Sequence, residues 1–199
     1  ELELISTPST VLDFFPGNPN TCSPYTWLNA PGFATLNANM FGLPECPRES
    51  AVTGGLETVA VLDDGFFGQH EDSYGLSGTG ADMWGAGGQR DDEYAAIYRT
   101  GAVADGEAVS VRVDSLNDAH PWAKSGVVVR NDLSAAGTSA GYAIAAVTPG
   151  NGVAFQWDAD GDGYLDSVAQ APVDTFRAVW VKLERAGEEL LASYSYDGV

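Results

Sequence analysis

Apolar and polar residues alternate along much of this chain with a period of two, which is the period of a β-strand that is buried on one face. The segments 106–116 (GEAVSVRVDSL) and 178–187 (AVWVKLERAG) show this alternation most clearly. Each places three apolar side chains on one face: Val109, Val111 and Val113 in the first, and Val179, Val181 and Leu183 in the second. We therefore expect both segments to be strands with one face in a core.

Three other runs are continuously apolar, as expected for central strands that are covered on both faces. They are SGVVVRND (125–132), GYAIAAVT (141–148) and GVAFQWD (152–158). The segments 93–103 and 190–198 are two further candidate strands, which brings the number from Glu93 onward to at least seven. Turn residues separate the runs, and no segment has a convincing helical period. This pattern predicts an all-β sandwich of two antiparallel sheets.

Residues 1–60 differ from the rest, because they hold seven of the ten prolines and no long periodic segment. We expect an N-terminal arm and loop that pack on a sandwich formed by residues 61–199. The two cysteines of the chain, Cys22 and Cys46, lie in this region and favour one disulfide that closes a loop. Two singly buried thiols are the alternative. A metal site is less expected here, because neither histidine lies near the cysteines.

The charge of the chain is strongly negative, with 28 acidic against 9 basic residues and a formal net charge of −19. An acidic, lysine-poor surface around an ordinary core indicates adaptation to high salt, where screening weakens the repulsion between carboxylates. An ordinary acidic secreted protein is the alternative. Nucleic acid and anionic membrane surfaces are poor partners at this charge, whereas neutral glycans, cations and basic surfaces remain possible. No apolar run is long enough to span a membrane, so we expect no membrane insertion.

Four segments together resemble a known family. They are SGTGADMWG (77–85), the long segment 92–133 that contains HPWAKSGVVVRNDL, VTPGNGVAFQWDADGDG (147–163) and VWVKLERAGEELLASYSYDG (179–198). In order and spacing they resemble an extracellular concanavalin A-like sandwich module of bacteria and archaea, over about residues 65–199. The resemblance implies a jelly-roll of two antiparallel sheets that serves as an accessory part of a secreted or cell-surface protein. It does not imply one ligand, because fold alone does not establish function.

The most specific chemical signal is the acidic segment WDADGDGYLDS (157–167). Its aspartates and one glycine occupy positions 1, 3, 5, 6 and 9 of a calcium-loop pattern, and the carbonyl of Tyr164 occupies the place of a backbone ligand. The bidentate glutamate of an EF-hand is missing, so we expect a calcium loop carried by a hairpin. A hydrated acidic turn is the alternative. The expected Ca²⁺ ligands are Asp158, Asp160, Asp162, Tyr164 and Asp166.

Catalytic signatures are weak throughout the sequence. No strand carries the alternating carboxylates with which related sandwich glucanases cleave glycans, and there is no Gly-x-Ser-x-Gly motif. His120 precedes Pro121 and is interpreted as a turn residue rather than a general base. Aromatic side chains can stack on sugar rings, and we expect Trp157 and Tyr164 to be the exposed candidates for glycan binding.

These observations favour a noncatalytic extracellular or cell-surface module, stabilised by calcium and directed to a glycan or another cell-surface component. A structural subunit of a cell-surface filament is the first alternative, and a glycan hydrolase with an unrecognised site is the second. Members of the family that this chain resembles continue beyond the YSTDG-like hairpin with a further strand, and the sequence given ends one residue after Gly198.

The segment ELELIST (1–7) alternates apolar and acidic residues before Pro8 ends the pattern. An extended segment of this kind can add to a sheet edge by backbone pairing. We therefore expect residues 1–7 to form a strand that completes a sheet, either within the chain or by self-association with a neighbouring subunit. A sequence cut short before the last strand is the alternative.

Overall fold

The structure is a computed structural model of the chain. The structure describes residues 2–6, 10–11, 55–60, 66–70, 73–78, 81–114, 116, 120–131, 141–174 and 177–198. Within these ranges the regular elements are strands, apart from one short 3-10 helix, η1 (Ala86–Gly88), and the strand pairs are all antiparallel. The prediction of an all-β protein with antiparallel sheets is therefore confirmed.

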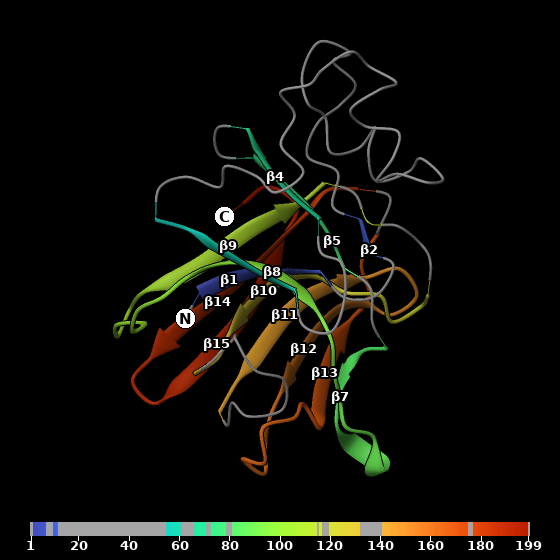
Figure 1. Cartoon of the computed structure of the whole chain (residues 1–199), viewed down its shortest axis with the longest axis vertical. Helices are drawn as coiled ribbons and strands as arrows, with labels where there is room; N and C mark the ends of the chain where they lie inside the picture. Colours follow the sequence, from blue (N-terminus) through green and yellow to red (C-terminus); the bar gives the residue numbers. More distant parts are fainter. Residues whose placement is uncertain are drawn as a thin grey trace.

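The larger sheet has seven strands and the sheet that packs against it has three. In spatial order the larger sheet consists of β13 (Ser167–Ala171), β12 (Gly152–Trp157), β11 (Ala143–Thr148), β10 (Ser125–Val129), β1 (Leu2–Ser6), β8 (Ala95–Arg99) and β3 (Glu57–Ala60). The smaller sheet consists of β15 (Glu189–Ser195), β14 (Val179–Ala186) and β9 (Ala108–Val113). Strands β10 to β13 lie side by side in Figure 1.

Two short ribbons accompany these sheets. One contains β2 (Thr10–Val11), β5 (Ser73–Gly78) and β4 (Phe66–His70), and the other contains β6 (Met83–Trp84) and β7 (Asp91–Asp92). In Figure 1 the segment around β7 lies beside the end of the larger sheet that carries β12 and β13.

The main core lies between the two sheets. Alternation in β14 buries Val179, Val181 and Leu183, which pack against Ile97 of β8 and Val127 of β10. The outward residues of β9 and β14 stay partly or fully exposed, as their period of two predicts. Apolar burial of this kind is the dominant stabilising contribution to folding.

A second apolar cluster covers the other face of the larger sheet. It contains eight buried residues from the sheet, from the segment around β6 and β7, and from the acidic loop: Met83, Tyr94, Ala96, Val128, Tyr142, Ile144, Ala146 and Leu165. Strands β10 and β11 are thus buried on both faces, which confirms the interpretation of their continuous apolar runs.

A buried ion pair lies within this outer cluster. Asp92 accepts two hydrogen bonds from the guanidinium of Arg130, at 3.0 and 2.8 Å, and both side chains are almost completely buried. The rings of Tyr94 and Tyr142 lie over the same guanidinium, at 5.4 and 4.2 Å from its central carbon. Burial opposes the charge of Arg130, but the hydrogen bonds to Asp92 and the surrounding charges outweigh it and raise the pKa of Arg130 above its ordinary value.

A second buried cation is also paired with an aspartate. The ammonium of Lys124 pairs with Asp82, and the Lys124 residue is fully buried. Burial lowers the pKa of Lys124 below its ordinary value, while the charge of Asp82 opposes this change. One lysine and one arginine of this acidic chain are therefore structural, and each is neutralised by an aspartate from the segment around β6 and β7.

The seven strands expected from residue 93 onward are all present, as β8, β9, β10, β11, β12, β14 and β15. The sequence pattern missed β13, whose residues are mostly exposed and carry no clear alternation. Strands β1 and β3 come from residues 1–60 and belong to the larger sheet. Most of that region, including Cys22 and Cys46, lies outside the described residues, so the disulfide and the boundary at residue 60 stay predictions.

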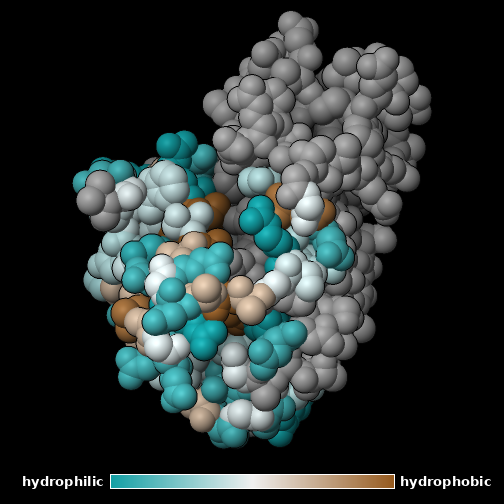
Figure 2. Space-filling view, turned by 90° about the vertical axis from the view of Figure 1, so that its left-hand side faces the viewer, coloured by the Kyte–Doolittle hydropathy of each residue, from teal (hydrophilic) through white to brown (hydrophobic). Residues whose placement is uncertain are grey.

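Residues 1–7 were expected to form a strand, and this is confirmed for Leu2–Ser6. The strand lies between β10 and β8 in the interior of the larger sheet, instead of adding to an edge. The edge of β15 pairs only with β14 among the described residues. On the face shown in Figure 2 the coloured surface is mostly hydrophilic, with small hydrophobic patches between the hydrophilic residues.

Candidate functional site

The acidic loop joins β12 to β13 and is anchored to the outer cluster. The side chain of Leu165 is fully buried in that cluster. The backbone N–H of Gly85 donates to the carbonyl of Leu165 at 2.6 Å, and a Cβ at Gly85 would collide with the side chain of Tyr164. Only glycine at position 85 therefore allows the loop to approach the segment after β6 so closely.

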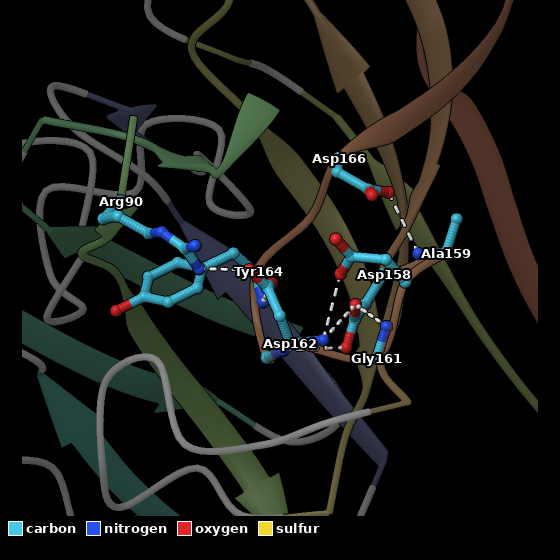
Figure 3. Close-up of polar contacts among 9 residues, drawn as sticks. Arg90, Asp158, Ala159, Gly161, Asp162, Tyr164 and Asp166 are labelled. Atoms are coloured by element: carbon cyan, nitrogen blue, oxygen red, sulfur yellow. Dashed lines mark hydrogen bonds and ion pairs between the residues drawn. The ribbon is translucent and has the colours of Figure 1, made fainter. Parts of the chain in front are cut away.

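Asp158 organises the loop through its carboxylate. One oxygen accepts hydrogen bonds from the backbone N–H groups of Gly161 and Asp162, at 2.8 and 3.2 Å. The other oxygen accepts from Gly163 at 3.1 Å and from Gly141 at 3.0 Å. Gly161 and Gly163 have φ values of 77° and 94°, which other residues rarely adopt. The loop thus curls around the Asp158 carboxylate (Figure 3).

The remaining aspartates support the same turn. Asp160 accepts from the backbone of Asp162 at 3.0 Å, and Asp162 accepts from the backbone of Tyr164 at 3.1 Å. Asp166 accepts from the backbone of Ala159 at 2.9 Å and so closes the base of the loop. Each of the four carboxylates therefore stabilises the loop conformation.

Arg90 is a component of the site that the sequence did not indicate. Its guanidinium forms an ion pair with Asp162 and lies 4.8 Å from the centroid of the Tyr164 ring. Figure 3 shows the side chain approaching the loop from a separate segment. Because 72 positions separate Arg90 from Asp162, no local pattern could reveal this contact.

The geometry of three carboxylates is compatible with a calcium ion. Asp158, Asp160 and Asp162 each offer an oxygen, and these oxygens all lie within 4.8 Å of one another. Ca²⁺ binds oxygens at about 2.3–2.6 Å, so two of its ligands are separated by at most about 5 Å. Asp166 is not part of this group among the described residues. Calcium also takes carbonyl and water oxygens, which could complete the 6–8 ligands that it requires.

The two expected glycan-binding aromatics are only half-exposed. Trp157 stacks on Phe155, with ring centroids 5.1 Å apart and an interplanar angle of 26°. Tyr164 packs against Gly85 and beneath Arg90. The larger exposed hydrophobic side chains within the described residues are Val168, Leu191, Tyr194 and Tyr196.

An apolar groove of about 360 Å³ lies between the edges of the two sheets. On one side Phe155, Ala169 and Ala171 line it from β12 and β13, and on the other Leu190 to Tyr194 line it from β15. Tyr194 pairs with the buried Val181, so it lies on the face of β15 that points toward the larger sheet. It remains 43% exposed, because no described strand extends the smaller sheet beyond β15 at this position.

A larger hollow, of about 490 Å³, lies near the start of β15 and has a mixed lining. Arg185 lies there, and its guanidinium donates to the carbonyls of Val103 and Gly187. Glu188 and Glu189 also line this hollow. This charged lining is typical of a solvated surface rather than of an aromatic surface that binds sugar rings.

His120 is part of a turn, as the sequence indicated. The N–H of Ala123 donates to the carbonyl of His120 at 2.9 Å, which closes the turn over Pro121. The Nδ1 atom of His120 accepts a hydrogen bond from the N–H of Trp122 at 3.2 Å, and the residue is exposed.

The described part of the chain contains no helix that is long and apolar enough to cross a membrane. Comparisons with known proteins found no match: no protein-family model, no curated protein and no solved structure corresponds to this chain.

Proposed function

We propose that this chain is a noncatalytic, calcium-stabilised module of the concanavalin A-like jelly-roll type that binds a neutral glycan outside the cell or at its surface. The observation that carries the proposal is the apolar groove between β12, β13 and β15. A binding site needs a concave surface with an apolar floor, and Tyr194 places an exposed aromatic ring at this groove. The apolar face of a sugar ring packs favourably on an aromatic plane.

The acidic loop and the groove are connected through β12. Phe155 lines the groove, Trp157 stacks on Phe155, and Asp158 follows directly in the loop. A calcium ion that orders the loop at Asp158 would therefore also hold Trp157 against Phe155. Calcium thus has a structural role in this proposal, and its effect on glycan binding is indirect.

The charge of the chain supports a neutral ligand. A net charge of −19 repels anionic polysaccharides, nucleic acids and anionic membranes at low and moderate salt. Neutral glycans are not affected by this repulsion. An acidic surface also suits a protein that works in high salt, where screening is strong.

Binding to a glycan array tests the ligand. We expect the wild-type protein to bind neutral oligosaccharides and Tyr194→Ala to lose at least tenfold in affinity. Tyr196→Ala is the matched control, because Tyr196 is 38% exposed but accepts a hydrogen bond from the backbone N–H of Asp174 and does not line the groove. Equal affinities of the two variants, or no binding by the wild type, would reject the groove as a glycan site.

Calcium binding is tested by thermal unfolding. A ligand that binds only the folded state stabilises it by about 2.7 kcal/mol at 100 times its dissociation constant. For a chain of this size we expect the melting temperature to rise by about 5–10 °C. Asp158→Asn should remove this increment. Asp105→Asn is the matched control, because Asp105 also accepts a backbone hydrogen bond, from Gly187, but lies outside the acidic loop.

A further inference from the structure

Strand β1 occupies a slot between β8 and β10. Each of its five residues is paired on both sides, for example Leu4 with Ile97 of β8 and with Val127 of β10. Both of these partners are buried in the main core. Five pairs on each side correspond to about five backbone hydrogen bonds with each neighbour.

The larger sheet depends on this strand for its continuity. The neighbours of β8 are β1 and β3, and the neighbours of β10 are β1 and β11. Without β1 the sheet divides into β13-β12-β11-β10 and β8-β3, and each part has an unpaired edge. Unpaired edges next to a core recruit other extended segments. The slot therefore accepts a segment with the backbone and side-chain pattern of Leu2–Ser6.

Nothing in the pairing of β1 requires that strand and slot belong to one molecule. The partners of Leu2 are Arg99 and Val129, so the strand contacts residues far along the chain. The same segment from another copy would form the same hydrogen bonds in the same register. Exchange of an identical element is for this reason a low-cost route to association.

The connection after β1 favours exchange. Three residues, 7–9, join Ser6 to β2, which pairs with Ser77 and Gly78 of β5. Short hinge connections favour swapping of the element that they carry.

We propose that copies of this chain associate by exchanging Leu2–Ser6, so that the segment of one copy fills the slot between β8 and β10 of another. The donated strand and the slot are different surfaces, so one-way exchange builds an open chain of copies, and mutual exchange of two copies closes a dimer. With a net charge of −19 the copies repel each other, and association requires salt to screen them. This proposal is independent of the glycan and of the calcium loop.

Disulfide trapping in the full chain tests the exchange. Ser6 and Ser125 are register partners, and paired residues of antiparallel strands lie within the Cα separation that a disulfide spans. The buried hydroxyl of Ser125 has no hydrogen-bond partner among the described residues, so Ser125→Cys removes no bond. Protein carrying Ser6→Cys and Ser125→Cys is oxidised in about 2 M salt, at several protein concentrations, and separated on denaturing, non-reducing gels.

We expect covalent dimers or longer ladders that increase with protein concentration, collapse to monomer on reduction, and are absent from both single variants. The single variants also control for Cys22 and Cys46. Leu2→Cys with Val129→Cys traps the same slot at its other end and replaces the first pair if that pair disturbs folding. Cross-linked monomer alone, at every protein and salt concentration, would show that the strand stays in its own chain and would overturn the proposal. Failure of both pairs to cross-link in a folded protein would overturn it as well.

Discussion

The buried pair of Asp92 and Arg130 yields the most direct test of the structure. Asp92→Asn keeps the shape of the side chain and removes its charge. Arg130 cannot lose its proton, so its guanidinium would remain charged in the outer cluster without the charge of the Asp92 carboxylate. Tyr142, whose hydroxyl donates to Asp92 at 3.3 Å, would also lose a charged acceptor.

The expected cost follows from burial. The side chains of Arg130 and Asp92 are 0% and 1% exposed, so water cannot solvate the charge that remains. Removal of one partner from a buried pair costs about 3–5 kcal/mol. With a urea dependence of about 2 kcal/mol per molar, the unfolding midpoint should fall by about 1.5–2.5 M.

The assay is equilibrium unfolding in urea, followed by tryptophan fluorescence. Asp114→Asn is the matched control, because Asp114 pairs with Arg112 on the surface, where the two side chains are 27% and 51% exposed. An exposed pair contributes about 0–1 kcal/mol. Asp92→Asn combined with Arg130→Met removes the isolated charge and should recover part of the lost stability.

A loss below 1 kcal/mol for Asp92→Asn, equal to that of Asp114→Asn, would refute the reasoning. It would mean that water reaches Arg130, and that the segment around β7 does not cover the larger sheet as the structure places it. If the double variant is no more stable than Asp92→Asn alone, the uncompensated charge of Arg130 is not the main source of the lost stability.

Three further predictions concern other parts of the chain. Burial and the charge of Asp92 raise the pKa of Tyr142 above its ordinary value of 10.0, although the charge of Arg130 opposes this change. The folded state therefore holds the hydroxyl proton of Tyr142 more tightly than the unfolded state does. The stability that depends on this proton is complete below pH 10 and is lost as the pH rises further. Tyr142→Phe should therefore reduce the fall of the unfolding free energy above pH 10 by up to about 1.4 kcal/mol per pH unit, and an unchanged slope would contradict this. Arg90→Gln removes the cation beside Asp162 and should raise calcium affinity about two- to fivefold in calorimetry, whereas a weaker affinity would show that Arg90 only supports the loop. Cys22 and Cys46 should resist alkylation in denatured, non-reduced protein, and reduction should cost about 3 kcal/mol of stability; two reactive thiols would exclude the disulfide.

Local patterns were sufficient for part of the candidate site. Asp158, Asp160 and Asp162 lie within five positions, so the curl of one loop brings their oxygens together and the spacing predicts it. Local patterns did not predict the exposure of the aromatic residues, because the exposure of Trp157 and Tyr164 depends on which other residues pack against them. Tyr194 is the better exposed aromatic at the groove, although it alternates like a core residue.

The sequence by itself determined the class of fold and most of its strands. A period of two is a property of neighbouring residues, and it distinguishes half-buried strands such as β9 and β14 from the doubly covered β10 and β11. Charge and loop spacing are equally local, which is why the residues alone reveal the acidic surface and the acidic loop.

Only the tertiary structure decided which distant segments meet. The place of β1 between β8 and β10, the pairing of Arg130 with Asp92 and of Arg90 with Asp162, and the open groove beside β15 all join residues far apart in the chain. A strand's pattern shows that one face must be buried, but many partners could bury it equally well. The choice among them depends on the packing of the whole chain, since the entropy of closing each loop must be offset by contacts that exist only in the complete fold.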